Sequence, residues 1–363
     1  MKKAFIHLAG YLLLTVLVTA CFSKEEPRRS TGTIIIDEGW LIPQSSVIDS
    51  GLGFDGIPAL EEPLMVDAAT VDYLDANDLV IGFFTGESYR VYPHKILDWH
   101  EIINDRADKL HFSINYCPLT GTGMVWDMFL NGERSTYGVS GLLYNSNLMP
   151  YDRRTQSLWS QMLMRCIKGE RAGEEPEYHA VVETTWETWQ KLYPNSSVTS
   201  INTGFVRPYN VYPYINQITF ADYRVDEFLI SPIDKDDRRL HRKERVLGVN
   251  INDEAKVYRF SSFGDPISII SDKFQGKELV IVGSKKLKFI LSFFADIDDQ
   301  TLVFEPIIDD LPNILRDNEG NVWDVFGYAT DGPRTGQQLG IPKSNMGYWF
   351  AWGAIFEGAE IFE

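Results

Sequence analysis

The chain has few of the residues that reveal chemistry directly. Its 363 residues include only three cysteines, Cys21, Cys117 and Cys166, and no C-x-x-C, H-x-H or H-E-x-x-H motif. A disulfide-rich scaffold and a zinc finger are therefore excluded. Basic residues are also scarce, because 34 Lys and Arg face 51 Asp and Glu and leave a formal charge of −17. Such a surface repels a nucleic-acid backbone, so we expect no DNA or RNA partner.

The sequence has one long apolar run, and it lies at the N-terminus. Met1-Lys2-Lys3 precedes the apolar stretch 4–17, which is too short and wrongly flanked for a stable membrane span. The small residues Val18-Thr19-Ala20 and then Cys21 follow it. This arrangement resembles a bacterial lipoprotein signal peptide. The alternative is an ordinary secretory signal in which Cys21 is incidental.

The resemblance implies a lipid anchor. Residues 1–20 would be removed, and Cys21 would carry a diacylglycerol thioether together with an acyl chain such as palmitate on its amine. Phe22 and Ser23, rather than an aspartate, follow the cysteine and argue against retention in the inner membrane. We therefore expect an outer-membrane lipoprotein of the cell envelope, on the periplasmic face or the cell surface. Its expected partner is the membrane, reached through Cys21 and a tether within residues 21–49.

The first half of the mature chain recurs in the second half. Segments 80–92 and 246–258 match at an offset of 166 (258 − 92), and Trp159 matches Trp323 at 164 (323 − 159). Steady offsets of this kind indicate an internal duplication. The expected organisation is a first repeat at 50–200, a connecting segment at 201–245 and a second, degenerate repeat at 246–363.

Local patterns favour strands over helices. Runs rich in Val, Ile, Tyr and Phe alternate with Gly, Asn and Asp turns, and Asn131-Gly132 is a hairpin signal because both residues tolerate positive φ. The predicted fold class is β-rich α+β, with two tandem degenerate repeats packed as pseudo-twofold halves. In the first repeat the pattern predicts strands at 79–84, 89–92, 110–117, 124–130, 136–144 and 158–167, and short helices at 68–74, 93–103 and 185–193.

A cluster of reactive side chains occurs in the first repeat. His100 and Asn104 are i and i+4 in the helix expected at 93–103, Glu101 lies beside them, and Cys117 ends the strand 110–117. His94 is six residues from His100 and would lie on another face, so His100 is the better candidate. The second repeat replaces the four cluster residues by Ile267, Ser268, Ser271 and Ser284.

This loss separates function from folding. Residues that only hold the fold should persist in both copies, as Asp105 and Asp272 do. The residues that the second copy has lost are therefore the candidate functional ones. A first interpretation of His100, Glu101 and Cys117 is a metal site, because imidazole, carboxylate and thiolate suit copper or zinc.

Two other interpretations stay open. In the second, Cys117 is a thiolate nucleophile and His100 its base, and Glu101 or Asn104 orients the base. The backbone amides of the turn after Cys117, or Asn145, then donate to an oxyanion. In the third, the cluster is structural. Cys117 is then a buried apolar residue or pairs with Cys166 in a disulfide, and His100 only forms hydrogen bonds.

A second polar stretch, 140–161, follows the cluster. It contains many hydroxyl and amide side chains between the expected strands, which suggests the polar wall of a pocket. The binding residues expected from it are Ser140, Asn145, Ser160 and Gln161, together with Thr120 in the turn after Cys117.

Five motifs in a fixed order resemble a known family. They are Asp55–Leu60, His100–Asp105, Asn115–Gly121, Gly138–Leu148 and Ser157–Gln161. Together they resemble the bacterial domain-of-unknown-function family DUF3179, over nearly all of the mature chain. The resemblance implies no established activity, substrate or cofactor. The family often has a second cysteine at the position of Thr120, and its replacement here leaves a site with a single thiol.

These observations predict an envelope lipoprotein with a metal- or small-ligand-binding pocket in the first repeat. A Cys/His enzyme is the alternative. A structural or partner-binding lipoprotein is a third class, suggested by the aromatic residues near the C-terminus, among them Trp349 and Trp352.

Overall fold

The computed structural model describes residues 39–215 and 219–363, and these described residues belong to one compact unit. The expected signal peptide, Cys21 and the first part of the tether lie outside the described residues. The chain joins the fold before residue 49, where the tether was expected to end. Trp40 and Ile42 are buried, and β1 (Val47–Asp49) pairs with β11 (Tyr137–Tyr144).

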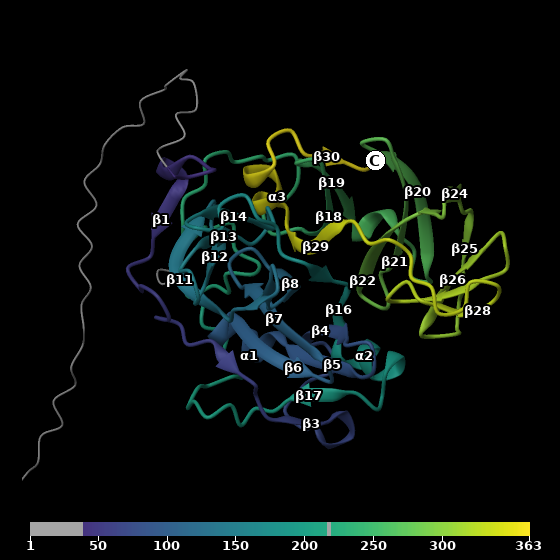
Figure 1. The fold of residues 1–363 in the computed structure, drawn as a ribbon, viewed down its shortest axis with the longest axis horizontal. Helices are drawn as coiled ribbons and strands as arrows, with labels where there is room; N and C mark the ends of the chain where they lie inside the picture. The colour runs from purple at the N-terminus through teal and green to yellow at the C-terminus, as the bar shows by residue number, and fades with distance from the viewer. Residues whose placement is uncertain (1–38, 216–218) are drawn as a thin grey trace, which may run out of the picture. The chain divides into compact units, whose positions relative to one another are not determined.

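Strands make up most of the regular structure of this unit (Figure 1). The described residues contain three α-helices, each of seven residues, namely α1 (His94–His100), α2 (Trp186–Leu192) and α3 (Trp349–Ile355). The expected β-rich α+β class is thus confirmed. None of the described helices is both long enough and apolar enough to cross a membrane.

The first half of the chain forms three five-stranded sheets and a hairpin. The first sheet has the order β15 (Tyr178–His179), β8 (Thr122–Asp127), β7 (Leu110–Cys117), β6 (Ile102–Ala107) and β2 (Leu60–Glu61). The second has the order β16 (Val181–Thr185), β4 (Leu79–Phe84), β5 (Tyr89–Pro93), β17 (Ser197–Thr199) and β3 (Met65–Asp67). The third has the order β1, β11, β12 (Asn147–Asp152), β13 (Leu158–Ser160) and β14 (Arg165–Lys168), and the hairpin joins β9 (Phe129–Leu130) to β10 (Glu133–Arg134).

The second half forms three smaller sheets and another hairpin. One sheet has the order β29 (Lys343–Tyr348), β18 (Arg245–Ile251), β19 (Glu254–Arg259) and β30 (Glu360–Ile361). Another has the order β20 (Ser268–Phe274), β21 (Lys277–Ser284) and β22 (Phe289–Phe294). The third has the order β25 (Phe304–Pro306), β26 (Asn313–Asp317), β27 (Val322–Asp324) and β28 (Ala329–Asp331), and the hairpin joins β23 (Asp296–Ile297) to β24 (Gln300–Thr301).

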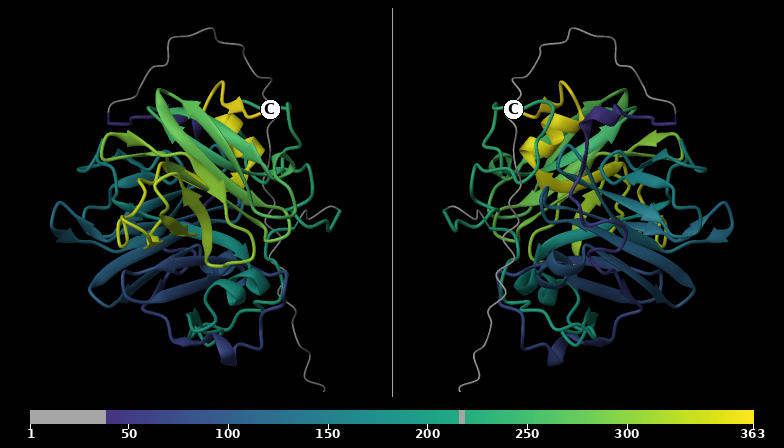
Figure 2. Two further views of the ribbon diagram at one scale, coloured as in Figure 1. Left: turned by 90° about the vertical axis from the view of Figure 1, so that its right-hand side faces the viewer. Right: turned by 90° about the vertical axis from the view of Figure 1, so that its left-hand side faces the viewer.

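Strand order and pairing direction correspond between the halves. The order β16-β4-β5-β17 corresponds to β29-β18-β19-β30, and each set contains two antiparallel pairs and one parallel pair. The order β6-β7-β8 likewise corresponds to β20-β21-β22, and α2 and α3 follow directly after β16 and β29. Figures 1 and 2 show the purple-to-teal first half beside the green-to-yellow second half.

Two close helix-to-strand contacts recur in both halves. Gly82 on β4 lies under Trp189 of α2, so that a Cβ atom at this position would lie 1.7 Å from the indole Cζ3. Gly248 on β18 lies under Trp352 of α3, where a Cβ atom would lie 2.2 Å from Cε2. Each glycine therefore lets a fully buried tryptophan pack directly on the strand backbone.

A hydrogen bond across each half recurs as well. The Tyr92 hydroxyl donates to Asp105 at 2.7 Å, and the Tyr258 hydroxyl donates to Asp272 at 2.7 Å. Both tyrosines are fully buried. Asp105 and Asp272 thus act as internal acceptors that fix a strand against its neighbour, in agreement with the structural role expected for Asp105.

Strand β29 joins the second half to the first. It packs against β8, and the Tyr348 backbone N–H donates to the carbonyl of Thr120 at 2.8 Å. An ion pair between Glu183 on β16 and Arg245 on β18 crosses the same junction. Trp189 and Trp323 belong to one hydrophobic cluster that draws residues from both halves. The core is therefore continuous across the junction.

The strand predictions were largely confirmed. The expected strands 79–84 and 110–117 coincide with β4 and β7. Asn131 and Gly132 both have positive φ and close the hairpin between β9 and β10. The strand expected at 158–167 is instead two strands, β13 and β14, joined by a turn.

The helix predictions were less accurate. The helix expected at 68–74 was wrong, because only a single 3₁₀ turn forms, at Ala68–Thr70. The helix expected at 93–103 ends at His100, where Glu101 takes a φ of 59° and the chain enters β6. This early ending places His100 and Asn104 on different elements, so the predicted i, i+4 pair does not form.

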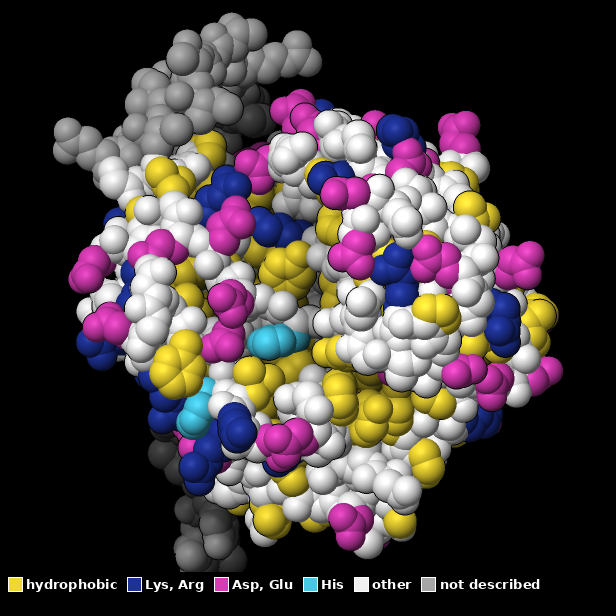
Figure 3. All heavy atoms as spheres, turned by 45° about the vertical axis from the view of Figure 1, so that its right-hand side comes forward, with side chains coloured by type: hydrophobic (Ala, Val, Ile, Leu, Met, Phe, Trp, Pro, Cys, Tyr) yellow, Lys and Arg dark blue, Asp and Glu magenta, His cyan; other side chains and the backbone are white. Residues whose placement is uncertain are grey.

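The surface carries mixed charges. On the face in Figure 3, Lys and Arg side chains are interspersed with Asp and Glu, and hydrophobic side chains and a histidine are visible in a hollow near the centre. The net negative charge of the chain is therefore not gathered into one acidic patch on this face.

The packing of Trp189 on Gly82 gives a direct test of the fold. Gly82→Ala adds a Cβ atom 1.7 Å from the indole, and overpacking of this kind costs about 1–3 kcal/mol, so urea unfolding should show a loss of at least that size. Gly264→Ala is the matched control, because its Cβ would meet nothing closer than Pro266 Cδ at 3.6 Å. Its stability should stay within about 0.5 kcal/mol of wild type. Equal stability of the two variants would contradict the packing.

Candidate functional site

His100 lies at the last turn of α1 and is fully buried. Its Nδ1 is 2.8 Å from the carbonyl oxygen of Pro58, and its Nε2 is 2.7 Å from the hydroxyl of Tyr209. Burial lowers the pKa of the imidazole. Both ring nitrogens are therefore occupied by protein partners, and neither is free for a metal or for a thiol.

Glu101 and Cys117 lie close together but face other partners. The Glu101 carboxyl accepts a hydrogen bond from the Tyr214 hydroxyl at 2.7 Å, and burial raises the pKa of Glu101 to about 7. The Cys117 Sγ accepts the Leu148 N–H at 3.3 Å and contacts the Ser146 carbonyl at 3.7 Å. Burial raises the pKa of the Cys117 thiol to about 11. The thiol is consequently protonated and shielded at neutral pH.

These contacts bear on all three interpretations of the cluster. Residues 39–215 and 219–363 contain no group of three or more His, Cys, Asp or Glu side chains that could hold a metal ion, so His100, Glu101 and Cys117 form no ready metal centre. His100 makes its hydrogen bonds to Pro58 and Tyr209 rather than to Cys117. The alternative of a disulfide was wrong, because Cys117 and Cys166 are both buried free thiols.

Asn104 holds two strands of the first half together. Its Nδ2 donates to the Tyr137 carbonyl at 2.7 Å, and its Oδ1 accepts the Tyr137 N–H at 2.9 Å. The same Nδ2 donates to Glu61 at 2.9 Å. This side chain therefore replaces a backbone partner between β6 and β11 and does not face the other cluster residues.

The expected polar wall is an internal hydrogen-bond network. Gln161 Oε1 accepts from Asn147 at 2.7 Å and from Thr122 at 2.7 Å, and Gln161 Nε2 donates to the Asn115 carbonyl at 2.7 Å. Thr120 takes part through a 3.0 Å hydrogen bond from Asn147. The side chains of Gln161, Asn147, Thr122 and Thr120 are almost completely buried. Because the protein itself satisfies these groups, the network fixes the turn after Cys117 and lines no cavity that we identify.

The remaining expected residues also serve the fold. The Ser140 hydroxyl donates to the Met149 carbonyl at 2.5 Å, and the Ser160 hydroxyl accepts the Leu163 N–H at 3.4 Å. Asn145 accepts the Asp234 N–H at 2.7 Å and so fixes the connecting segment to the first half. None of these three side chains is free to bind a ligand in this conformation.

A cavity lies on the other face of α1. His94 and Asp98 are i and i+4 on the helix, so they share one face, and both line a cavity of about 190 Å³. We call this the α1 cavity. It takes walls from the first half, the connecting segment and the second half. The side chains used in the argument are those of His94, Asp98, Tyr116, Arg224, Arg245 and Tyr348.

Two buried polar groups in the α1 cavity lack hydrogen-bond partners. Among the described residues, Asp98 Oδ1 and His94 Nε2 have none, although Glu183 Oε1 lies 3.5 Å from that nitrogen. Burial raises the pKa of Asp98 to about 8, while burial and the nearby Arg245 and Arg224 lower the pKa of His94 well below its usual value. At neutral pH the cavity thus presents a protonated carboxyl and a neutral imidazole.

Hydrogen-bond donors dominate the rest of the lining. The hydroxyls of Tyr116 and Tyr348 have no hydrogen-bond partner in the part of the chain that the structure describes. Arg245 pairs with Glu183 through one terminal nitrogen, and Arg224 binds Asp222 through Nε and one terminal nitrogen. Each guanidinium therefore keeps N–H groups that the described protein atoms leave free.

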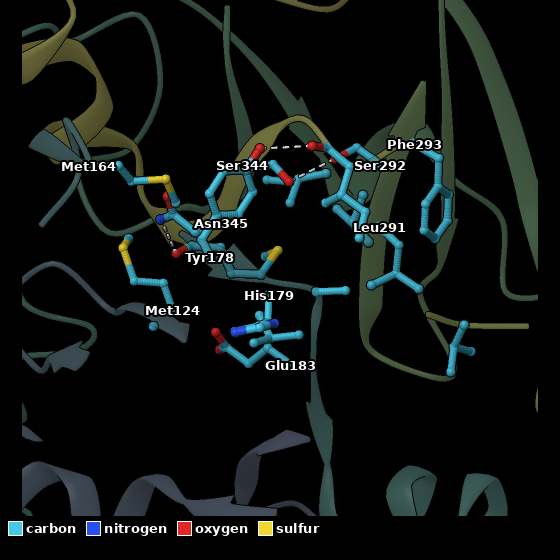
Figure 4. A pocket seen from close by; sticks show the side chains of 18 residues that line it. Met124, Met164, Tyr178, His179, Glu183, Leu291, Ser292, Phe293, Ser344 and Asn345 are labelled. Carbon is cyan, nitrogen blue, oxygen red and sulfur yellow. Dashed lines mark hydrogen bonds between the residues drawn. The ribbon is translucent and has the colours of Figure 1, made fainter. Parts of the chain in front are cut away.

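A second cavity differs in character. It has a volume of about 40 Å³ and is lined largely by apolar and thioether side chains, among them Met124, Met164 and Leu291, with Tyr178 and His179 (Figure 4). Lining residues of this cavity bind one another, as in the hydrogen bond from Ser292 to Ser344 at 2.8 Å. This space is too small for more than one or two waters, so it resembles a packing defect more than a binding site.

Sequence reasoning missed the α1 cavity although it had the means to find it. It set His94 aside for lying on a different helix face from His100, and that face is the one that lines the cavity. The i, i+4 rule applied to His94 and Asp98 would have selected the pair. Arg224, Arg245 and Tyr348 carry no local signal, because only the fold brings them to α1.

The environment of the two cysteines gives a testable expectation. Cys117 and Cys166 are 1% and 0% exposed, and burial raises their thiol pKa values to about 11 and about 12. In the folded 22–363 chain neither thiol should react with a disulfide reagent at mildly alkaline pH, whereas both should react after denaturation. Rapid reaction of one thiol in the folded protein, mapped to Cys117 by peptide mass, would instead return the nucleophile interpretation to first place.

The comparisons with known proteins agree with the motif analysis. Residues 54–359 match the family described as a protein of unknown function, DUF3179. No curated protein and no solved structure gives a significant match to the chain. The matched region contains every residue of the α1 cavity, from Asn77 to Tyr348. The family resemblance inferred from the five motifs is thereby confirmed, and the chain belongs to the DUF3179 family.

Proposed function

We propose that this protein binds a small polar molecule in the α1 cavity. The observation that carries the proposal is the pair of buried, unpartnered polar groups, Asp98 Oδ1 and His94 Nε2, on side chains that line an open space. Leaving such a group unsatisfied costs about 1–3 kcal/mol, and native proteins rarely tolerate it without a water or a ligand. The expected small-ligand pocket is thus retained, with its location moved from His100 to His94.

The geometry favours binding over the other proposals for the first repeat. A metal site would need ligands that His100, Glu101 and Cys117 already commit to protein partners. A thiol nucleophile would need a thiolate, and the raised pKa of Cys117 disfavours it. The α1 cavity requires no such rearrangement, because Asp98 Oδ1 and His94 Nε2 have no hydrogen-bond partner among the described residues.

The halves themselves are best explained by duplication. We propose that they arose as tandem repeats and pack as pseudo-twofold halves, a proposal supported by the steady sequence offsets and the corresponding strand orders. The paired contacts of Gly82 with Trp189 and of Gly248 with Trp352 support the same view. On this account the α1 cavity formed at the seam between two copies.

The cellular setting is also a proposal. The residues 18–21 before and at the expected cleavage site support a lipoprotein held at the outer membrane through Cys21. The ligand-binding unit would then work in the envelope, tethered to lipid by the segment that precedes Trp40. No nucleic-acid partner is expected for so acidic a chain.

One substitution can distinguish a ligand-binding role of Asp98 from a structural role. Asp98→Leu keeps the branched shape and the number of side-chain heavy atoms, and it removes an unsatisfied buried polar group. The cavity leaves room for the larger methyl groups, so the apo protein should unfold at equal or higher urea concentration. In the same variant, thermal shifts caused by small polar probes should disappear. The probe panel is sodium phosphate, sodium acetate, methylammonium chloride, glycerol and urea at matched ionic strength, and at least one should raise the wild-type midpoint by about 2 °C.

Asp105→Leu is the matched control, since Asp105 is a buried aspartate that accepts a hydrogen bond from Tyr92 at 2.7 Å. It should lose about 2 kcal/mol or more while any probe response persists. If Asp98→Leu were destabilised as strongly as Asp105→Leu, Asp98 would be a structural residue. If no probe shifted the wild-type midpoint, the binding proposal would fail.

Lipidation can be tested independently of ligand binding. Expression in a bacterium that processes lipoproteins should give a protein whose N-terminal peptide carries lipid on Cys21 and begins at that residue, as read by mass spectrometry. Cys21→Ser should abolish both the modification and partition into detergent. Release of an unmodified chain from the wild-type sequence would favour an ordinary secretory signal.

A further inference from the structure

The lining of the α1 cavity has more free hydrogen-bond donors than acceptors. Free donors come from the Tyr116 and Tyr348 hydroxyls and from the unused guanidinium nitrogens of Arg224 and Arg245. Asp98 adds an O–H, because burial raises its pKa to about 8. The chief acceptor besides the carboxyl oxygens is the neutral imidazole of His94. A ligand that fits this lining must bring acceptors of its own.

The charged side chains of the lining also supply hydrogen-bond donors. The cavity is lined by three cations, Lys95, Arg224 and Arg245, and by two carboxyl groups, Asp78 and Asp98. Lys95 lies 2.6 Å from Asp78, so these two offset each other. The two arginines remain, in a chain whose formal charge is −17. The guanidinium groups of these two arginines are therefore the charged hydrogen-bond donors that the lining can offer to a ligand.

The carboxylates that are paired with the two arginines limit how much negative charge a ligand in the cavity can carry. Glu183 pairs with Arg245, and Asp222 pairs with Arg224, so each guanidinium is already partly neutralised. A ligand with low charge gains hydrogen bonds to the free N–H and O–H groups without displacing either carboxylate. A strongly charged polyanion would meet repulsion from Glu183 and Asp222 and from the rest of the surface.

We propose that the molecule bound in the α1 cavity is a small oxyanion, of phosphate, sulfate or carboxylate chemistry, held by Arg224, Arg245, Tyr116 and Tyr348. This inference rests on the proposed function and names its ligand class. The oxygen atoms of the anion accept hydrogen bonds from the guanidinium groups, which can only donate. They also accept from the phenol hydroxyls, which can either donate or accept. The cavity of about 190 Å³ restricts the ligand to a molecule of few atoms.

The test measures the affinity of the full chain for sodium phosphate, sodium sulfate and sodium acetate by calorimetry at constant ionic strength, with glycerol and urea as neutral probes. At least one anion should bind, and the neutral probes should not. Tyr116→Phe and Tyr348→Phe delete one hydroxyl each and should weaken the binding by about tenfold, since a hydrogen bond to a charged group is worth that much. Arg224→Gln should weaken it at least as strongly.

Tyr209→Phe is the matched control, because its hydroxyl binds His100 and lies outside the α1 cavity. It should leave the anion affinity unchanged. Circular dichroism and the unfolding midpoint of each variant establish that the fold is intact, and the single-atom Tyr→Phe changes keep the test meaningful if Arg224→Gln fails to fold.

The outcomes distinguish the oxyanion inference from the proposed ligand-binding function. Binding of a neutral probe that Asp98→Leu abolishes, with no binding of any anion, would overturn the oxyanion inference and leave the ligand-binding function standing. Anion binding that none of the cavity variants weakens would place the anion elsewhere and also overturn the inference. Failure of every probe would overturn both. The relative affinities for phosphate, sulfate and acetate then decide which oxyanion chemistry the cavity prefers.

Discussion

The ion pair between Glu183 and Arg245 is the constraint on which the architecture depends. Glu183 lies on β16 in the first half, with its side chain 4% exposed, and Arg245 begins β18 in the second half. The buried Glu183 carboxylate depends on this partner, since leaving one charge of a buried pair alone typically costs about 3–5 kcal/mol. The second half must therefore be folded against the first for Glu183 to be tolerated as a carboxylate. The same pair directs the remaining guanidinium nitrogens of Arg245 towards the α1 cavity and places Glu183 beside His94.

Much of the fold followed from local sequence, and the candidate site did not. Strands such as β4 and β7 were predictable because β-branched and aromatic residues alternate between clear turn signals. The end of α1 was not, because Glu101 takes a positive φ that its residue type does not announce. Because α1 ends there, Asn104 lies on β6 and not on the helix where we expected it. The sequence also cannot distinguish a buried amide whose hydrogen bonds are all made within the protein, such as that of Gln161, from one that is free to bind a ligand. The distinction depends on hydrogen-bond partners that lie far away in the chain.

Part of the predicted cluster anchors the connecting segment, residues 201–245. His100 binds Tyr209, Glu101 binds Tyr214, and Asn145 binds Asp234, so all three hold this segment against the first half. We had expected these side chains to be chemical ones. Their partners lie 89 to 113 residues away in the chain, so the sequence around each residue could not reveal the contact.

The α1 cavity takes Asp98 from the first half, Tyr348 from the second half and Arg224 from the connecting segment. Neither half of the present chain contains all of these side chains. On our proposal that the halves arose by duplication, a single copy would have lacked this site. Selection for the proposed ligand would then act on the junction as a whole and oppose any drift that loosened it.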